Sequence, residues 1–286
     1  MKDRIDPLIA DRAPWLFRPS ASALLARPIL NHILGYHQTV TLAQEIAALP
    51  AQRILDLMAE RLARCVAVSG LDHLPRQGPA LVVANHPTGI ADGVILHSVL
   101  RHVRSDAYYF ANHDILKVLP QMAETIAPVE WRKDRRSHAK TRETMVYTRR
   151  AVKDGRLGVI FPSGRLAKRR GMRLHERPWM PSAAMLARKF DLPVIPVHIQ
   201  ARNSVMFYLF DAIHPTLRDI TLFHETLNKD RQPFDVTIGE PISPTALRDT
   251  PDDAIALLRR ATLALGEPKK RGVSLWAASR SKPRRV

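Results

Sequence analysis

Five short apolar runs constrain the fold of this chain more than any other feature. They are ALVVAN, AYYFAN, LGVIFP, LPVIPVHI and FDVTIGE, starting at residues 80, 107, 157, 192 and 234, and each is rich in Val, Ile or aromatic residues. Most of them follow a turn signal or a run with helical periodicity. Strands that are apolar on both faces are typical of parallel sheets covered by helices. The sequence therefore predicts an α/β sandwich with a largely parallel central sheet.

A helical pattern precedes these strands, from about residue 15 to residue 66. Leu25, Ile29 and Ile33 recur every four residues, and Trp15 and Phe17 stand just before them. An amphipathic helix with such aromatic residues is suited to insertion at a membrane surface. The same three residues equally suit packing on the body of the protein, so the sequence leaves both interpretations open.

The change of pattern suggests three segments. Residues 1–65 form an N-terminal helical segment that is a candidate for membrane association. Residues 66–245 hold the strands, and residues 246–286 contain a closing helix and a basic tail.

The charge of the chain restricts its partners. Lys and Arg exceed Asp and Glu by 17, so the surface attracts polyanions such as nucleic acid, an anionic membrane or phosphorylated ligands. The sequence contains no RRM, KH or zinc-finger motif, and its basic stretches lack interleaved aromatic residues, so we do not expect nucleic acid as the partner. Neither a membrane span nor a signal peptide is evident. These features predict a cytoplasmic protein, peripheral on the inner face of the cell membrane.

The stretch LVVANHPTGIADGVIL, residues 81–96, carries the first candidate site. Asn85 and His86 end a predicted parallel strand, which is where α/β sheets place their ligands. Asp92 falls in the first turn of the next helix, from which a carboxylate can reach the imidazole. A carboxylate on one ring nitrogen leaves the other to accept a proton, as a general base requires. A structural Asp that caps the helix beside a strand-end His would give the same pattern.

Two basic stretches are further candidates. In GRLGVIFPSGRLAKRRGMR a buried strand ends at Pro162, Ser163 and Gly164, and a cluster of cations beginning with Arg165 follows. Backbone amides and guanidinium groups at such a turn suit a phosphate or carboxylate headgroup. The second stretch, APVEWRKDRRSHAKTRET at 127–144, pairs a strand end with a basic helix that begins near Arg132. Either run can also be read as a solvated charged face.

Metal and cofactor signals are absent from the sequence. The HETLN segment at 224 lacks the second histidine of HExxH, and no Cys/His cluster exists, so we predict neither a metal nor a cofactor. The single cysteine excludes an internal disulfide.

Taken in order, VAVSGLDHLPRQGPALVVANHPTGIADG, APVEWR, GVIFPSG, LPVIPVHI and VTIGEPI resemble the PlsC-like lysophospholipid (glycerolipid) acyltransferase family over residues 66–242. The closest resemblance is to the branch of hemolysin-like and ornithine-lipid acyltransferases. It implies a PlsC-like sandwich for residues 66–245. It also implies that His86 is the general base and that Asp92 orients it, although HPTGIAD places five residues between them where the family usually has four.

The resemblance extends to substrate-binding positions. Arg132 matches the arginine of the second block, which binds an acceptor phosphate or carboxylate, although VEWR departs from the usual Val-Asp-Arg. The third block is matched by Phe161, Pro162, Ser163 and Gly164, followed by Arg165. Ser163 stands where most members have a glutamate associated with the acceptor, and this departure puts a glycerol-3-phosphate-type acceptor in doubt. Pro196 matches the proline of the fourth block, which supports the acyl or catalytic pocket.

The resulting hypothesis is an O-acyltransferase. It moves an acyl group from acyl carrier protein or coenzyme A to a hydroxyl of a lysolipid of the lysophospholipid or 1-acylglycerol-3-phosphate type at an anionic membrane surface. One alternative acceptor is lyso-ornithine lipid or another amino-acid lipid. A different class of function remains open, a non-catalytic protein that binds nucleic acid or membrane.

Overall fold

The computed structural model describes residues 1–130, 135–171, 173–247 and 250–266. Its α-helices and β-strands follow one another in the order α1 (Lys2–Arg12), α2 (Ala21–Ile33), α3 (Tyr36–Ile46), α4 (Ala51–Leu62), β1 (Val66–Ser69), β2 (Ala80–Ala84), α5 (Ile90–Leu100), β3 (Tyr108–Asn112), α6 (Asp114–Val118), β4 (Ile126–Val129), α7 (His138–Lys153), β5 (Leu157–Ile160), β6 (Lys168–Arg170), β7 (Arg173–His175), α8 (Ser182–Lys189), β8 (Val194–Gln200), α9 (Val205–Ile213), α10 (Pro215–Leu227), β9 (Phe234–Ile238) and α11 (Pro251–Ala264).

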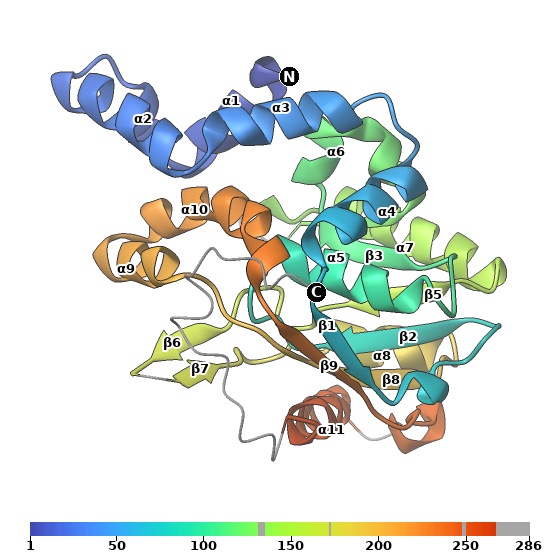
Figure 1. The fold of residues 1–286 in the computed structure, drawn as a ribbon. Helices are drawn as coiled ribbons and strands as arrows, with labels where there is room; N and C mark the ends of the chain where they lie inside the picture. The colour runs from blue at the N-terminus through green and yellow to red at the C-terminus, as the bar shows by residue number, and fades with distance from the viewer. Residues whose placement is uncertain (131–134, 172, 248–249, 267–286) are drawn as a thin grey trace.

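A seven-stranded sheet forms the centre of the molecule (Figure 1), with the strand order β1-β9-β8-β2-β5-β3-β4. All neighbouring strands in it are parallel except β8 and β9. Strand β2 lies between β5 and β8, so its carboxyl end opens at the middle of the sheet. The strands β6 and β7 form a separate antiparallel hairpin.

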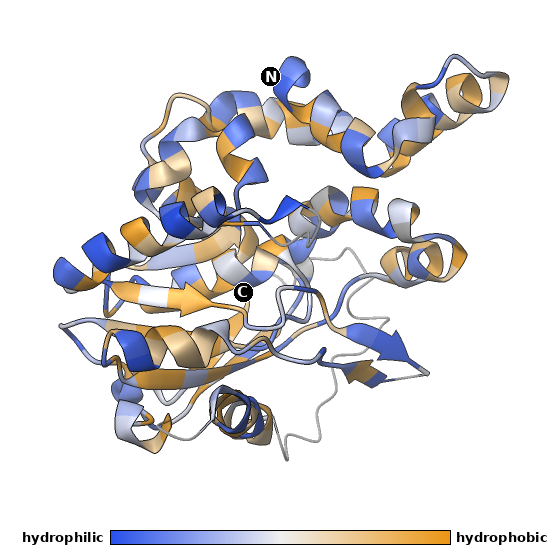
Figure 2. Ribbon diagram, turned by 180° about the vertical axis from the view of Figure 1, so that it is seen from behind, coloured by the Kyte–Doolittle hydropathy of each residue, from blue (hydrophilic) through white to orange (hydrophobic). Residues whose placement is uncertain are grey.

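Helices cover both faces of the sheet, because alternate residues of each strand point to opposite sides. On β2, Val82 packs in a core with residues of α1, α3, α4 and α5, whereas Leu81 and Val83 pack in a second core with residues of α7, α8 and α11. Figure 2 shows the apolar colouring of the central strands between these two helical layers. The predicted α/β sandwich with a largely parallel sheet is confirmed.

All five predicted strands are present, and the closing helix is α11. The list of predicted strands omitted β1, β6 and β7, which are short and largely exposed, and it marked β4 only by the strand end in APVEWR. The structure also contains α1, which the sequence pattern did not predict. Within the described residues, no helix combines the length and the apolar character needed to cross a bilayer.

The N-terminal helical segment is present as α1 to α4. Its structure excludes the interpretation that Leu25, Ile29 and Ile33 pack on the body of the protein. Leu25, Ile29 and Ile33 are 71%, 58% and 42% exposed. These residues of α2 therefore do not pack on the body of the protein. The opposite side of α2 does so, because Ala26 and Leu30 join a small core with residues of α9 and α10.

Candidate active site

His86 lies two residues beyond the end of β2, on the loop that leads into α5. The preceding residue, Asn85, fixes the start of this loop. Its side chain donates to the carbonyl of Ile199 at 2.9 Å and accepts from the amide of Ile199 at 2.7 Å, so it joins β2 to β8 as another strand residue would. The predicted site residue Asn85 therefore has a structural role, because its side chain is occupied in joining the carboxyl end of β2 to β8.

Asp92 anchors the loop from the first turn of α5. One carboxylate oxygen accepts from Nδ1 of His86 at 2.8 Å and from the amides of Thr88 and Gly89, and the other accepts from the Thr88 hydroxyl. The side chain of Asp92 is completely buried. Four hydrogen bonds therefore satisfy the two oxygens of this buried carboxylate. Gly89 permits the turn because its φ is +104°, a conformation that L side chains rarely adopt.

The imidazole of His86 is held in one orientation by a hydrogen bond at Nδ1, and its other nitrogen, Nε2, is available for a substrate. An ionised carboxylate only accepts hydrogen bonds, so in neutral His86 the proton lies on Nδ1 and Nε2 carries the lone pair. The ring stacks on Phe161 at 4.4 Å between centroids, and the side chain is 18% exposed. No hydrogen bond to Nε2 is found among the described residues. This nitrogen is available to accept a proton from an incoming hydroxyl.

Glu176 is a site residue that the sequence analysis missed. Its carboxylate accepts from the backbone amide of His86 at 3.2 Å and from the indole N–H of Trp179 at 3.1 Å. Burial raises the pKa of Glu176, although the hydrogen bonds from Trp179 and from the His86 amide act to lower it. Ser163 stands where the resembled family has its glutamate. In this chain a carboxylate near that position comes instead from Glu176, which lies later in the sequence. The serine in place of the family's glutamate was the one sequence feature that could have prompted a search for another carboxylate.

A buried polar network also holds the loop between β2 and α5, through the backbone of Thr88. Asn203 donates to the carbonyl of Thr88 at 3.3 Å and accepts from Nζ of Lys229 at 2.9 Å. Lys229 forms an ion pair with Glu225 at 3.2 Å, and both side chains are almost completely buried. Burial lowers the pKa of Lys229, while Glu225 acts to raise it. Removing one partner of such a pair leaves a buried charge and typically destabilises a protein by about 3–5 kcal/mol.

The third-block turn also contacts His86, through the ring of Phe161, and one of its backbone amides is bonded within the turn. The amide of Gly164 donates to the carbonyl of Phe161 within the turn at 2.9 Å. Pro162 and Ser163 are buried, whereas Arg165 is exposed. The Ser163 hydroxyl donates to the carbonyl of Arg165 at 2.8 Å.

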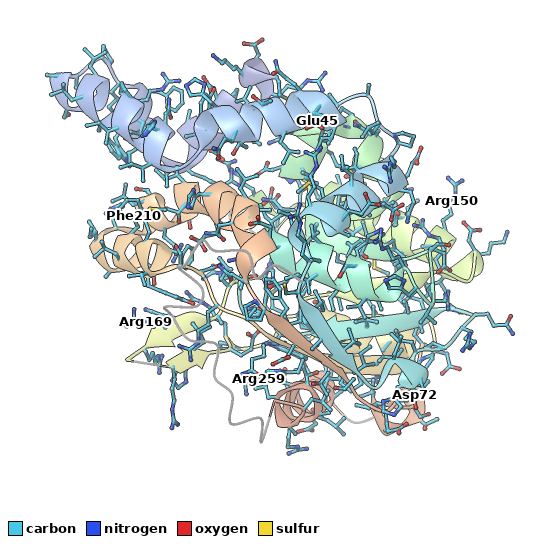
Figure 3. The ribbon with its side chains drawn as sticks, in the orientation of Figure 1. Glu45, Asp72, Arg150, Arg169, Phe210 and Arg259 are labelled. Carbon is cyan, nitrogen blue, oxygen red and sulfur yellow. The ribbon has the colours of Figure 1, made fainter. Side chains whose placement is uncertain are left out.

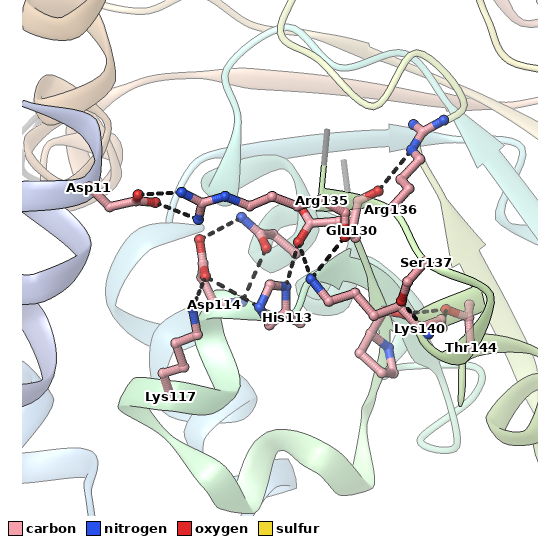
Figure 4. Close-up of polar contacts among 12 residues, drawn as sticks. Asp11, His113, Asp114, Lys117, Glu130, Arg135, Arg136, Ser137, Lys140 and Thr144 are labelled. Carbon is pink, nitrogen blue, oxygen red and sulfur yellow. Dashed lines mark hydrogen bonds and ion pairs between the residues drawn. The ribbon is translucent and has the colours of Figure 1, made fainter. Parts of the chain in front are cut away.

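The second basic stretch forms a charge cluster at the ends of β3 and β4 (Figure 4). Arg135 binds Asp11 of α1 through two nitrogens, at 2.7 and 3.1 Å, and Arg136 donates to the carbonyl of Glu130 at 3.1 Å. Lys140 pairs with the carboxylate of Glu130 at 2.7 Å. These contacts tie the N-terminal helix to the loop after β4. Arg132, the residue expected to bind the acceptor, lies outside the described residues.

Pro196 lies within the sheet rather than at its edge. It is buried in β8, in register with Val83, and its carbonyl accepts from the amide of Gly239. The structure thus brings together His86, Asp92 and Phe161 with the newly found Glu176, and places Pro196 apart from them. Among the described residues, no group of three or more His, Cys, Asp and Glu side chains could hold a metal ion.

An imidazole oriented by a buried carboxylate, on a loop at the carboxyl end of a parallel strand, has the arrangement that a general base needs. Such a loop suits enzymes that activate a hydroxyl for transfer of an acyl group. The comparisons with known proteins agree. Residues 65–200 match the family model described as Acyltransferase.

Two curated relatives and one solved structure are similar to the chain. The Lyso-glycine lipid O-acyltransferase of Phocaeicola vulgatus is 27% identical over 66% of this chain and 68% of its own length. The enzyme of the same name from Bacteroides thetaiotaomicron is 29% identical over 66% and 70%. The 1-acyl-sn-glycerophosphate acyltransferase PlsC of Thermotoga maritima shares the fold with a TM-score of 0.52 at 14% identity, covering 86% of this chain and 98% of that one. The chain therefore matches the Acyltransferase family model over residues 65–200 and shares the fold of PlsC.

Proposed function

We propose that this protein transfers a fatty acyl group from a thioester, acyl carrier protein or acyl-coenzyme A, to a hydroxyl of a lysolipid, with His86 as the general base. The observation that carries the proposal is the hydrogen bond between Nδ1 of His86 and the buried carboxylate of Asp92, with Nε2 left to accept a proton. This arrangement also favours catalysis over the alternative of a fold that only binds membrane or nucleic acid. A purely structural capping role for Asp92 requires no such open nitrogen.

The residues support a direct transfer. Nε2 of His86 takes the proton of the acceptor hydroxyl while the hydroxyl oxygen attacks the carbonyl carbon of the thioester. Asp92 stabilises the imidazolium that results. Collapse of the tetrahedral intermediate breaks the C–S bond, and the leaving thiolate takes the proton from His86. The products are an ester and a free thiol.

We infer that the acceptor is a lysolipid with an anionic headgroup. Two observations favour an amino-acid headgroup over glycerol phosphate. Both curated relatives are named for a lyso-glycine lipid. In addition, Ser163 replaces the acceptor-associated glutamate of the third block, and the carboxylate near that position comes from Glu176, which is bonded to the His86 amide. A lysophospholipid remains the second candidate.

We also propose that the protein works as a peripheral protein on the anionic inner face of the cell membrane. Leu25, Ile29 and Ile33 of α2 are exposed, and a groove of about 520 Å³ beside this helix is lined by apolar residues and cations: Leu16, Phe17, Leu24, Arg18 and Arg27. Polybasic segments contribute on the order of 1 kcal/mol per Lys or Arg near an anionic surface. We retain the division into residues 1–65, 66–245 and 246–286 as a working description of the segments.

Labelled acyl carrier protein and acyl-coenzyme A, offered with a panel of lysolipids, test the function. The panel contains lyso-amino-acid lipids, a 1-acylglycerol-3-phosphate and other lysophospholipids, and His86→Ala serves as the matched variant. We expect the wild type to acylate a lyso-amino-acid lipid and the folded variant to lose that transfer. Equal transfer by both proteins contradicts the role of His86, and exclusive transfer to a lysophospholipid contradicts the acceptor.

A further inference from the structure

Helix α9 (Val205–Ile213) carries an apolar stripe that the rest of the protein does not cover. Val205, Leu209 and Ile213 follow one another every four residues and are 49%, 56% and 62% exposed. Residues spaced in this way lie on one face of a helix. The other side of α9 is packed, since Phe207 and Tyr208 are buried. The exposed stripe is therefore a defined face of a well-packed helix, not the surface of a loose segment.

The basic hairpin β6–β7 lies against α9. The guanidinium of Arg169 stands over the ring of Tyr208 at 5.3 Å from its centroid, a cation–π contact that joins the hairpin to the helix. Figure 3 places the labelled Arg169 and Phe210 on the same side of the molecule. Lys168, Arg170 and Arg173 of the hairpin are exposed.

The same hairpin adjoins the catalytic loop. The amide of Ala167, the residue before β6, donates to the carbonyl of His86 at 2.9 Å. Arg177, which follows the hairpin, adds to the positive charge of this region. Burial lowers its pKa, and the positive charges of Arg165, Arg218 and Arg170 lower it further. An apolar stripe and a cluster of cations thus lie beside the residue that accepts the proton.

We propose that the exposed stripe of α9 and the cations of the β6–β7 hairpin form a lipid-contact surface that seats the His86 loop on an anionic bilayer. An interfacial helix combines an apolar face with flanking cations in this way. The excess of 17 cations over the chain complements an anionic leaflet. Helix α2, which also carries exposed apolar residues, lies on the same side of the molecule as α9 (Figure 1), so the two helices can provide two contacts rather than one.

This inference rests on the proposed function, because the acceptor is itself a component of the bilayer. A single helix fixes depth but not orientation. A second contact bonded to the His86 loop orients the loop toward the lipid, so that an acceptor hydroxyl reaches Nε2 without leaving the interface.

Sedimentation with vesicles of phosphatidylcholine and phosphatidylglycerol in equal parts tests the surface. The variant is Leu209→Ser with Ile213→Ser. Its matched control is Val146→Ser with Met185→Ser, which changes residues of α7 and α8 that are exposed to the same degree, 59% and 56%. We expect the α9 variant to bind at least about tenfold more weakly than the wild type and the control to bind normally. Wild-type binding by the α9 variant, or equal loss in the control, overturns the proposal.

Charge variants test the hairpin separately. Arg170→Gln with Arg173→Gln should lower binding to the same vesicles by roughly fivefold per cation, and leave the weak binding to pure phosphatidylcholine unchanged. An equal loss on both kinds of vesicle contradicts an electrostatic role.

Activity separates this inference from the proposed function. With an acceptor embedded in vesicles, the α9 variant should be at least about tenfold slower than wild type. With a short-chain acceptor dispersed as monomers, the two should be equal. If neither transfers an acyl group to any acceptor, the proposed function fails while vesicle binding still decides the surface. If the α9 variant binds vesicles normally but has lost affinity for acyl carrier protein or has changed its oligomeric state, the face belongs to a protein partner and the lipid proposal is wrong.

Discussion

Helix α5 and the loop before it carry two histidine–carboxylate pairs with nearly identical contacts and different surroundings. Nδ1 of His86 binds Asp92 at 2.8 Å, and Nε2 of His97 binds Asp56 at the same distance. His86 has its second nitrogen unoccupied among the described residues and a side chain that is 18% exposed. In His97 the second nitrogen lies 3.1 Å from the hydroxyl of Tyr109, and the side chain is 2% exposed.

The comparison shows that a carboxylate beside an imidazole does not by itself make a base. Both rings are oriented by an acid, but only His86 can present a lone pair to a substrate. Burial lowers the pKa of His97 more than the hydrogen bond and charge of Asp56 raise it, so this ring is neutral and serves to join α4, α5 and β3. Each prediction below alters one of the two pairs or the support of the His86 loop.

His86→Ala should have the largest effect. If His86 is the general base, its loss should lower kcat by about 10³-fold, because general-base catalysis typically contributes a factor of that order. The fold should survive, since the ring stacks on Phe161 at the edge of the core. Steady-state kinetics with a circular dichroism spectrum measures both. His97→Phe is the matched control, and an equal fall in kcat for the two variants contradicts the distinction.

Asp92→Asn should lower kcat by on the order of 10²-fold, because an amide can present its N–H to Nδ1 and so favour the wrong tautomer of His86. The corresponding change in the other pair, Asp56→Asn, should leave kcat within about twofold of wild type, since His97 does no chemistry. Parallel measurements of kcat at one pH decide the point. A wild-type rate for Asp92→Asn removes Asp92 from the mechanism.

His97→Phe should act on stability alone. It leaves the Asp56 carboxylate and the Tyr109 hydroxyl without their imidazole partner, at a cost of about 1–3 kcal/mol in the free energy of unfolding. Urea denaturation measures this loss. An unchanged midpoint, or a large fall in kcat at temperatures where the variant is folded, contradicts the structural role.

The pair at His97 also predicts a pH dependence. Its pKa is lower in the folded state than the ordinary 6.5, so the unfolded chain binds the proton more readily. The contribution to stability is complete above pH 6.5 and is lost as the pH falls toward the folded pKa. The slope of unfolding free energy against pH below 6.5 should therefore be smaller in His97→Phe than in wild type. Identical slopes contradict the lowered pKa.

Among the changes around the His86 loop, those at Glu176 should have the smallest effect on the rate. Glu176→Ala removes the acceptor of both the His86 amide and the Trp179 indole, and we expect kcat to fall by about tenfold as the loop loses one of its supports. Glu176→Gln keeps one acceptor oxygen and should recover part of the rate. The pH profile of kcat distinguishes positioning from chemistry, because positioning lowers the rate without moving the profile. A shifted profile contradicts this assignment.

Much of this organisation was predictable from the sequence. Runs rich in Val, Ile or aromatic residues predicted β2, β3, β5, β8 and β9, because buried strands of a covered sheet are enriched in such residues. The His-Pro-Thr-Gly stretch predicted a turn, because Gly89 permits a backbone conformation that other residues rarely adopt. The link between Asp92 and His86 was also predictable, since the two residues are joined by one short turn.

Contacts between distant segments were not predictable in the same way. Glu176 reaches the His86 amide across ninety positions. The partners of the cations after β4 were not predictable either. Their number suggested anion binding, but Arg135 and Arg136 are engaged with Asp11 and with the backbone of Glu130.

The sequence by itself determined the parallel sheet, the turn after β2 and the proximity of His86 and Asp92, because each depends on local periodicity or on residues a few positions apart. Only the tertiary structure decided which of His86 and His97 keeps an open nitrogen, which carboxylate lies near Ser163, and that one apolar stripe on each of α2 and α9 faces outward. Those properties depend on what packs against a side chain, and that is set by the arrangement of all the elements together.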